Sequence, residues 1–308
     1  MINKCPLVLI VIPNKDGVEH LRNSLNSIFY SNYQNFHVVV VDNCSKDDSI
    51  KYVKNAHPKC RIIQNKKDLG FSGSVNKGLL YGLNIDADFI VVFSNDVVIY
   101  PQWLANAVDS FYTQEEYKIL GFKELNGIGC DSLLKTPVTI ESKQQSKPDC
   151  VSIYMIKSSL INNVGFFDES YYMYGEDDDF FYRCRQSGIF TQQTNIPIWH
   201  KGEGFSSSII RQKLMSQYVY RNMLRMSVKN HSAVKVFFTL IKMIAFAALP
   251  NFIWKNKGVN PSVNRLVRFN WFIRMRYLIY SIFWNIVNIR NTKKSALMER
   301  EWIKKHQY

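Results

Sequence analysis

Four consecutive carboxylates, Glu176 to Asp179, form the densest acidic cluster in the sequence. Aromatic residues lie on both sides of the cluster, and Gly188 closes the short helix that it is predicted to begin. Crowded carboxylates repel one another and lose hydration among apolar side chains, so at least one pKa should rise. A carboxylate with a raised pKa suits a general base. The cluster is therefore a candidate catalytic site in a chain whose net charge is +14.

A simpler role for these acids is capping, because the helix dipole favours negative charge in the first turn. Capping needs only one or two acids, however, and the segment lacks the alternating acids of a calcium-binding EF-hand loop. Asp179 and Arg183 are four residues apart and are predicted to pair on one face of the helix. Glu176, Asp177 and Asp178 remain as candidates for chemistry.

The elements that must position such a site follow an alternating pattern over the first 100 residues. Short β-branched runs alternate with helical patterns, which is typical of βαβ units and a mainly parallel sheet. Ser45 is predicted to open the second helix through a Ser-x-x-acid pattern. A polar connection at 122–148 is expected to form a mobile loop over the site. Strands are predicted at 7–12, 38–41, 61–64, 89–93, 151–156 and 194–200, and helices at 18–30, 45–53, 72–83 and from 101 onwards.

Polar residues follow the first four of these strands where each one ends. In an open parallel sheet the ligand binds outside the carboxyl ends of the strands, so these side chains are expected to gather along one edge. Asp42 at such a position can accept hydrogen bonds from a ribose hydroxyl or a base N–H. The structural alternative for Asp42 is an Asx turn. The residues that follow the strands are Pro13, Asn14, Asp42, Asn43, Asn65, Ser94, Asn95 and Asp96.

The glycines at 70, 73 and 78 could leave backbone N–H groups open for a phosphate at a helix N-terminus, or could form only a tight loop. They match neither G-x-G-x-x-G nor G-x-x-x-x-G-K-[ST], which disfavours a dinucleotide oxidoreductase and a P-loop ATPase. Asp96 lies between apolar runs, where its oxygens suit Mg²⁺ or Mn²⁺ shared with substrate phosphates. The alternative for Asp96 is a solvated turn. His200 ends a predicted strand and is either a metal ligand or an ordinary hydrogen-bonded histidine.

The positive charge is concentrated after residue 200, in a segment that contains 20 Lys and Arg residues and only three acidic residues. Long basic helices are predicted at 211–229, 234–249 and 265–289, and we place two domains at 1–210 and 211–308. The 234–249 segment is too short and too charged to span a membrane. Aromatic residues of the C-terminal helices are interleaved with lysines and arginines, which suits the surface of an anionic bilayer. Packing on the first domain or a homo-oligomer contact are the alternatives.

Nucleic-acid binding is an alternative function for the basic region. A basic region rich in aromatic residues can bind nucleic acid, but these helices are strongly apolar and carry no recognition motif. The six cysteines contain no C-x-x-C pair, so they are interpreted as reduced thiols of a cytosolic protein without a zinc site. Residues 6–12 lack a following cleavage site and are predicted to be a buried strand rather than a signal peptide.

In combination, these segments resemble family 2 glycosyltransferases, and among them the bacterial rhamnosyltransferase-like group that builds surface polysaccharides. The resemblance covers residues 5 to about 230. It rests on the segments 12–14, 41–47, 65–78, 93–96, 174–183 and 220–222.

This resemblance implies an A-type, Rossmann-like α/β fold with a mainly parallel central sheet flanked by helices and followed by a basic helical extension. It implies inverting transfer of a sugar from a nucleotide-diphosphate donor to a saccharide or a polyprenyl-diphosphate-linked acceptor. A divalent cation, Mn²⁺ or Mg²⁺, would assist. The protein would act in the cytoplasm, with peripheral contact at the inner membrane.

The resemblance also assigns roles to residues. Asp177 would take the proton of the acceptor hydroxyl, with Glu176 supporting it. Asp96 would be the last residue of the metal motif, and His200 resembles the late histidine that also reaches the metal. The nucleotide-sugar would be bound by Pro13, Asn14, Asp42, Asn65, Gly70, Asn76 and Asn95.

Two positions depart from the family pattern. Ser94 occupies the first acidic position of the metal motif, so the ion would rest on Asp96, donor phosphates, water and His200. Asp178 occupies a position that is usually apolar, which leaves Asp178 open as an alternative base. The departure at Ser94 also raises the alternative of a catalytically inactive homologue that binds sugar or nucleotide.

Overall fold

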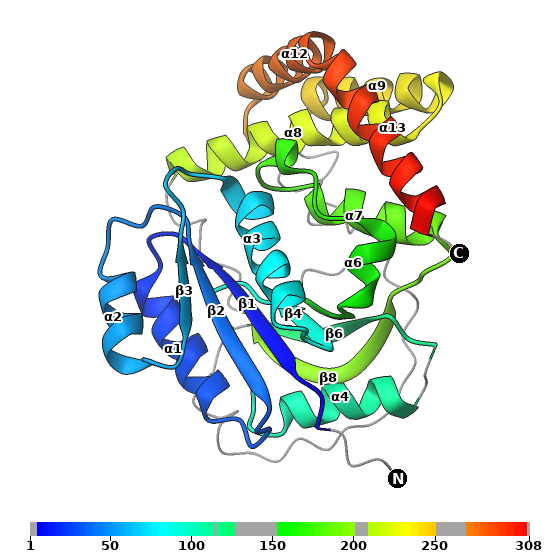
Figure 1. The fold of residues 1–308 in the computed structure, drawn as a ribbon. Helices are drawn as coiled ribbons and strands as arrows, with labels where there is room; N and C mark the ends of the chain where they lie inside the picture. The colour runs from blue at the N-terminus through cyan, green and yellow to red at the C-terminus, as the bar shows by residue number, and fades with distance from the viewer. Residues whose placement is uncertain (1–4, 114–115, 127–152, 201–208, 251–268, 307–308) are drawn as a thin grey trace. The chain divides into compact units, whose positions relative to one another are not determined.

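The computed structural model describes residues 5–113, 116–126, 153–200, 209–250 and 269–306 (Figure 1). The chain divides into two compact units. The first contains Met1–Tyr172 and Phe180–Phe205, and the second contains Met173–Asp179 and Ser206–Tyr308. The acidic segment that begins the sequence argument is thus grouped with the C-terminal helices, whereas the strand ends lie in the first unit.

The first unit is built on a mixed eight-stranded sheet with the order β3-β2-β1-β4-β7-β6-β8-β5. The strands β3, β2, β1 and β4 pair in parallel, and so do β6 and β8. Antiparallel pairs join β4 to β7, β7 to β6 and β8 to β5. The strands are β1 (Val8–Asn14), β2 (Phe36–Asp42), β3 (Arg61–Gln64), β4 (Phe89–Val92), β5 (Val97–Val98), β6 (Ile119–Asn126), β7 (Tyr154–Lys157) and β8 (Gln192–His200).

Both faces of this sheet are covered by helices, so the central strands contain continuous buried apolar runs. In β1, Val8, Ile10 and Ile12 join a core with α1 and α4, whereas Leu9 and Val11 join a second core with α3, α6 and α7. This alternation follows from the two-residue period of a strand. The helices are α1 (Val18–Phe29), α2 (Ser49–Ala56), α3 (Gly70–Asn84), α4 (Trp103–Thr113), α6 (Ser159–Val164) and α7 (Glu176–Gln186).

Close packing of α3 on the sheet explains one of the glycines that was considered for phosphate binding. A Cβ added to Gly78 would lie 2.1 Å from Cγ1 of Val11 in β1. A side chain at this position would therefore push the helix away from the strand. Gly78 serves the approach of helix and sheet.

The predicted elements are confirmed over most of the first unit, with two corrections. Residues 122–126 were expected in a polar connection, but they belong to β6, which pairs with both β7 and β8. The rest of that expected loop, 127–148, lies outside the described residues. The helix start at Ser45 is also wrong, because α2 begins at Ser49 and the Oγ atom of Ser45 accepts the Asp16 N–H at 3.0 Å.

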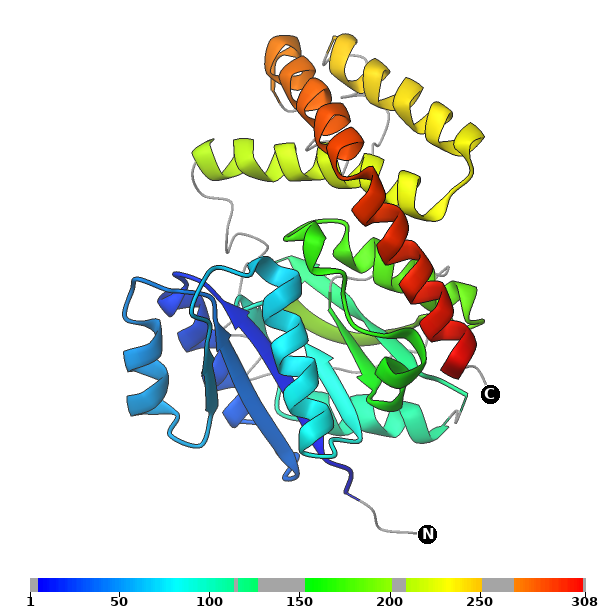
Figure 2. The same cartoon turned by 45° about the horizontal axis from the view of Figure 1, so that its top comes forward.

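The second unit is helical (Figure 2). Tyr220 and Leu224 of α8 pack with Met243 of α9 and with Tyr277 and Leu278 of α12 in one apolar core. No helix among the described residues is long and apolar enough to cross a membrane. The last helix, at the C-terminal end, was not predicted. The C-terminal helices among the described residues are α8 (Ile209–Asn230), α9 (Ala233–Ala248), α12 (Trp271–Val287) and α13 (Ile289–His306).

Candidate functional site

The carboxyl ends of three parallel strands bring Asn14, Asp42 and Asn65 together in the first unit. Asn14 and Asp42 are register partners at the ends of β1 and β2. The Asn65 N–H, which follows β3, donates to the carbonyl oxygen of Asp42 at 2.9 Å. Pro13 precedes Asn14 and is paired with Val41. The predicted gathering of these polar residues along one sheet edge is therefore a feature of the structure.

Asp42 has an acceptor oxygen to spare. The residue is 2% exposed, and its Oδ2 accepts the Ser45 N–H at 3.4 Å. Its Oδ1 is buried and has no hydrogen-bond partner within the described residues. A buried carboxylate oxygen without a donor is unfavourable, and a ligand hydroxyl or N–H would satisfy it. Asp42 thus has an Asx-like contact and still offers one oxygen.

Asn95 joins the same group from the loop after β4. Its Nδ2 donates to Oδ1 of Asn14 at 2.7 Å, and both side chains are buried. The Nδ2 of Asn14 in turn donates to Oγ of Ser45 at 3.3 Å. These contacts fix the orientation of the two amides beside Asp42.

Asp68 and Lys15, which were not predicted as site residues, also lie at this edge. Oδ1 of Asp68 accepts from Nδ2 of Asn43 at 2.6 Å, and Oδ2 is bound by Lys15 and by the Tyr172 hydroxyl. Burial by itself would raise the pKa of Asp68, but hydrogen bonds from Lys15, Tyr172 and the Gly70 amide lower it below its ordinary value. Lys15 follows the predicted Asn14, and Asp68 lies two residues before the predicted Gly70. This proximity in the sequence is what could have indicated them.

Gly70 begins α3 in a left-handed conformation, with φ of +68°. The amides of Phe71 and Ser72 donate to the carbonyl oxygen of Tyr172, at 2.7 Å and 3.4 Å. In this conformation those helix N-terminal donors are used by the chain itself rather than left open for a phosphate. A Cβ at Gly70 would lie 2.3 Å from that carbonyl oxygen, so glycine is required for the contact. A role for Gly70 in donor binding stays a prediction.

Asn76 is held away from the strand ends. Its Nδ2 donates to the Phe167 carbonyl at 2.9 Å and to Oε1 of Glu169 at 3.1 Å, and its Oδ1 accepts the Phe167 N–H at 2.9 Å. These bonds tie α3 to the turn before η1 (Glu169–Tyr171). The amide of Asn76 thus has a structural use, and its predicted part in sugar binding has not been tested.

The two predicted metal ligands are neighbours. Nε2 of His200, at the end of β8, lies 3.3 Å from Oδ1 of Asp96, and Nδ1 lies 2.9 Å from Oε2 of Glu124 in β6. Burial lowers the pKa of His200, but the two carboxylates outweigh it and raise the pKa to about 9. Glu124 was missed because its strand was taken for a loop. A carboxylate on Nδ1 is the usual means of orienting a histidine whose Nε2 binds a metal.

The acidic turn of α7 gives its four carboxylates different surroundings. Glu176 is buried and Asp178 is exposed, with Asp177 intermediate between them. Burial raises the pKa of Glu176 to about 7, partly opposed by a hydrogen bond from its own amide and assisted by the charge of Asp178. The raised pKa expected from crowding is present, but burial is its main cause. Asp179 is buried and accepts from Lys229 of α8, a partner that the sequence did not suggest.

Comparison with known proteins identifies the first 123 residues most directly. Residues 9–123 match the family model described as glycosyl transferase family 2. The hexosyltransferase Agl10 of low-salt glycan biosynthesis in Haloferax volcanii is 26% identical over 204 residues, which is 61% of this chain and 64% of that protein. A glycosyltransferase of Haemophilus influenzae is 25% identical over 128 residues, which is 39% of this chain and 37% of that protein. The matches thus span less than two thirds of these relatives.

Solved structures share the fold at low sequence identity. The mannosyltransferase PcManGT from Pyrobaculum calidifontis, in complex with GDP-Man and Mn²⁺, superposes with a TM-score of 0.55 and 14% identity over 92% of this chain and 88% of that chain. S. aureus TarS 1-349 gives 0.53 and 14% identity over 96% of this chain and 90% of its own. The fold is the predicted A-type α/β fold. Within this fold, residues 9–123 are similar in sequence to glycosyl transferase family 2.

Proposed function

We propose that this protein is an inverting glycosyltransferase that moves a hexosyl or deoxyhexosyl group from a nucleotide-diphosphate donor to a saccharide or lipid-linked saccharide acceptor. The observation that carries the proposal is the strand-end group of the first unit. There the buried Asp42 keeps one carboxylate oxygen without a partner beside the fixed amides of Asn14 and Asn95. This arrangement suits the hydroxyl and N–H groups of a nucleoside. The match to glycosyl transferase family 2 supports the same reading.

The reaction needs a base, an acceptor and a leaving group. Asp177 takes the proton of the acceptor hydroxyl, the freed oxygen attacks the anomeric carbon, and the bond from that carbon to the diphosphate breaks with inversion. The electron pair of that bond leaves with the nucleoside diphosphate. Glu176, with a pKa near 7, accompanies Asp177 at the start of α7. Asp178 is the alternative base because it is the exposed carboxylate of the same turn.

The donor set at Asp96 fits a divalent cation. Oδ1 of Asp96 and Nε2 of His200 adjoin, and oxygen with imidazole is a set that Mn²⁺ accepts. Glu124 would orient His200 through Nδ1. Such an ion would act as a Lewis acid that neutralises the charge of the departing diphosphate. The complex of the mannosyltransferase PcManGT contains Mn²⁺, which supports this part of the proposal.

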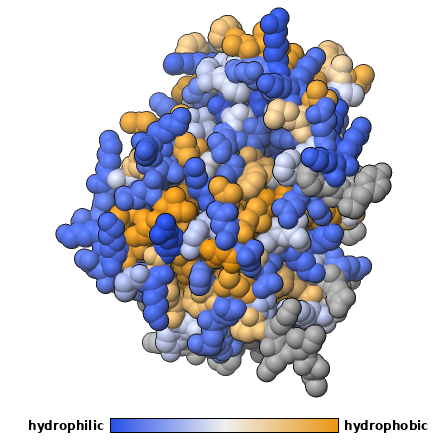
Figure 3. Space-filling view, viewed as in Figure 1, coloured by the Kyte–Doolittle hydropathy of each residue, from blue (hydrophilic) through white to orange (hydrophobic). Residues whose placement is uncertain are grey.

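We further propose that the second unit contacts an anionic membrane surface, which would suit a lipid-linked acceptor. Five apolar residues of α9 follow helical spacing, and all five are between 45% and 66% exposed. At the top of Figure 3, hydrophobic residues lie beside hydrophilic ones over the C-terminal helices. This apolar stripe consists of Val234, Phe237, Phe238, Ile241 and Ile244.

A second stripe lies on α12, which packs against α9. Its members are between 62% and 68% exposed. Lys235, Lys242 and Arg276 are exposed on the same two helices, and neither helix contains an acidic residue. Apolar stripes with basic neighbours fit the headgroup layer of an anionic bilayer. The second stripe consists of Phe272, Ile279, Phe283, Ile286 and Val287.

Binding of the donor tests the central proposal. A panel of nucleotide-sugars with Mn²⁺ is expected to contain at least one that raises the melting temperature, because a ligand that binds only the folded state stabilises it. The same donor is expected to give transfer or slow hydrolysis. Asp42→Ala should lose the shift. A protein that binds a nucleotide-sugar and never turns it over would instead be an inactive homologue, and one that ignores the whole panel would refute the proposal.

A further inference from the structure

The turn that leads into the acidic helix is held by one amide side chain. Asn222 of α8 is 1% exposed, and its Nδ2 donates to the carbonyl oxygens of Met173 at 2.8 Å and Tyr174 at 2.5 Å. Its Oδ1 accepts from Nε of Arg221 at 2.8 Å, which fixes which end of the amide faces the turn. All three hydrogen bonds lie within the second unit.

This turn needs outside support because its backbone is strained. Tyr174 has a φ of +64° and Gly175 a φ of +88°, so two successive residues are left-handed. For a residue with a side chain this conformation is unfavourable and persists only where the surroundings impose it. The carbonyls of Met173 and Tyr174 precede the helix and have no helical donor, so the two N–H bonds of Asn222 satisfy them.

The far side of the acidic turn is held by a buried ion cluster. Nζ of Lys229 lies 2.8 Å from Oδ2 of Asp179 and 2.8 Å from Oε1 of Glu299 in α13. Nδ2 of Asn230 donates to Oδ1 of Asp179 at 2.9 Å, so both oxygens of that carboxylate are bound. The side chains of Lys229 and Asp179 are wholly buried. Removal of one partner would leave a buried charge uncompensated.

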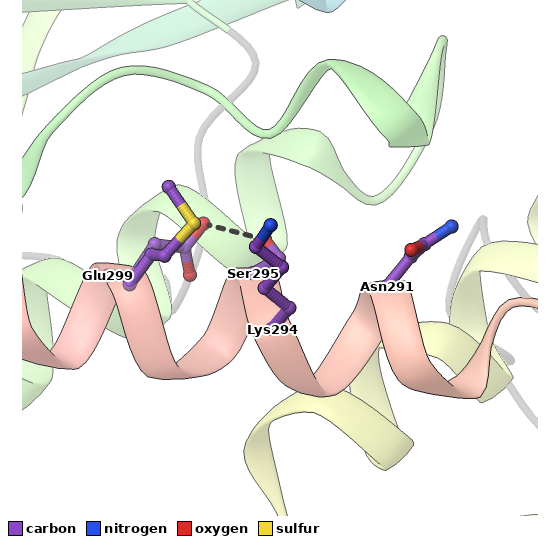
Figure 4. A pocket seen from close by; sticks show the side chains of 5 residues that line it. Asn291, Lys294, Ser295 and Glu299 are labelled. Carbon is purple, nitrogen blue, oxygen red and sulfur yellow. Dashed lines mark hydrogen bonds between the residues drawn. The ribbon is translucent and has the colours of Figure 1, made fainter.

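Glu299 is itself supported from its own helix. Oγ of Ser295 donates to Oε1 of Glu299 at 3.5 Å, and both line an open pocket on α13 (Figure 4). All lining residues of that pocket come from this one helix. Glu299 thus contacts Lys229 from α13 while Ser295 holds it from the same helix.

We propose that Asn222 and the cluster of Lys229, Asp179 and Glu299 are positioning residues for Asp177. Asn222 fixes the backbone three and four residues before Asp177, and the cluster fixes the side chain two residues after it. The C-terminal helices thus set the place of the base, and the inference rests on the proposed function of Asp177. An error of about 1 Å in such a group reduces the rate by on the order of 10².

The test replaces the donor end of Asn222. Asn222→Asp keeps the size of the side chain and the oxygen that accepts from Arg221, but it removes both N–H donors to the turn. Asn222→Ser keeps a single donor and serves if the aspartate variant does not fold. Asn285→Ala is the matched control, because Asn285 is also a buried amide of this unit but donates to the carbonyls of Arg221 and Ser281.

Two readouts are measured on each purified variant. Hydrogen exchange of the peptide covering 173–179 is expected to quicken at least tenfold in Asn222→Asp and to stay near wild type in Asn285→Ala. In transfer assays kcat should fall on the order of 10² in Asn222→Asp while KM for the donor changes less than threefold. Unchanged exchange of 173–179 in both Asn222 variants would overturn the inference, as would normal kcat.

The exchange readout also separates this inference from the proposed function. If the wild-type protein transfers no sugar but exchange quickens in Asn222→Asp, the glycosyltransferase assignment is refuted. The statement that Asn222 fixes the turn before α7 would still stand. If the wild-type protein transfers sugar and the Asn222 variants keep normal exchange and kcat, the glycosyltransferase assignment stands and the positioning role of Asn222 is refuted.

Discussion

Nε2 of His200 lies 3.3 Å from Oδ1 of Asp96, although the two residues are more than 100 positions apart in the sequence. The contact follows from the antiparallel pairing of β5 with β8, in which Val97 is opposite His200. Glu124 binds the other nitrogen of the ring from the neighbouring strand β6. A short edge strand thus joins two carboxylates and an imidazole at one point of the sheet.

Substitution of Asp96 is expected to remove the cation site. Asp96→Asn loses a charged oxygen ligand, so Mn²⁺ should no longer strengthen binding of the nucleoside diphosphate in titration calorimetry. Glu124→Gln acts only through His200 and should weaken the effect of Mn²⁺ by roughly 10- to 100-fold. Equal enhancement by Mn²⁺ in Asp96→Asn and wild type would move the metal away from Asp96.

The base is expected to be Asp177. Asp177→Asn should reduce kcat on the order of 10²- to 10⁴-fold, because an amide cannot accept the acceptor's proton, while calorimetric binding of the donor is retained. Asp178→Asn is the neighbouring control and should stay within a fewfold of wild type. The opposite order of the two variants would assign the base to Asp178.

Glu176 is expected to make stability depend on pH. Its pKa rises from 4.5 to about 7 on folding, so the folded state holds the proton more tightly than the unfolded state. The contribution of Glu176 to the free energy of unfolding should therefore fall as pH rises from 4.5 through about 7, by up to about 3 kcal/mol, and should not change above that. Glu176→Gln should abolish this fall in urea titrations at several pH values. A variant with the wild-type slope would exclude Glu176 as its source.

Gly70 is expected to be indispensable for the contact of α3 with Tyr172. Gly70→Ala combines a positive φ with a Cβ that would lie 2.3 Å from a carbonyl oxygen, and it should lower the free energy of unfolding by more than about 2 kcal/mol. Gly188→Ala tests strain alone, because Gly188 has a φ of +72° and nothing within 4 Å of the added Cβ, and about 1 kcal/mol is expected. If urea denaturation shows similar losses of unfolding free energy for Gly70→Ala and Gly188→Ala, the structure relieves the clash at Gly70.

The parallel half of the sheet could be predicted because its signals are local. The strand β2 contains a buried run of four valines and ends at Asp42, and the shorter strand β3 is followed by Asn65. β6 escaped prediction because Lys123 and Glu124 interrupt its apolar residues, and its pairing with β8 is irregular between Gly121 and Lys123. A strand defined by partners from elsewhere in the chain has little local signal.

The acidic turn illustrates the same limit for the site. Four adjacent carboxylates were visible in the sequence, but their division of labour depends on distant residues. The charge of Asp179 is balanced by Lys229, fifty positions away, and its burial follows from that pairing. Glu176 owes its raised pKa mainly to burial, which no spacing rule predicts. The residue types were enough to locate these candidate catalytic carboxylates, whereas the pKa of Glu176 could be inferred only from the tertiary structure.

The apolar stripes of α9 and α12 are expected to bind anionic vesicles. Phe237→Asp with Phe283→Asp places two charges on surfaces that are 60% and 66% exposed, so the fold should survive while flotation with phosphatidylglycerol vesicles at low salt falls severalfold. Vesicles of phosphatidylcholine alone should bind the wild type weakly, because the exposed lysines and arginines have no anionic partner there. Phe190→Asp provides the control, since Phe190 is 57% exposed in the first unit. A wild-type protein that stays in solution at low salt would exclude the membrane contact. If light scattering instead shows a larger particle for the wild type but not for the double variant, the stripes mediate self-association.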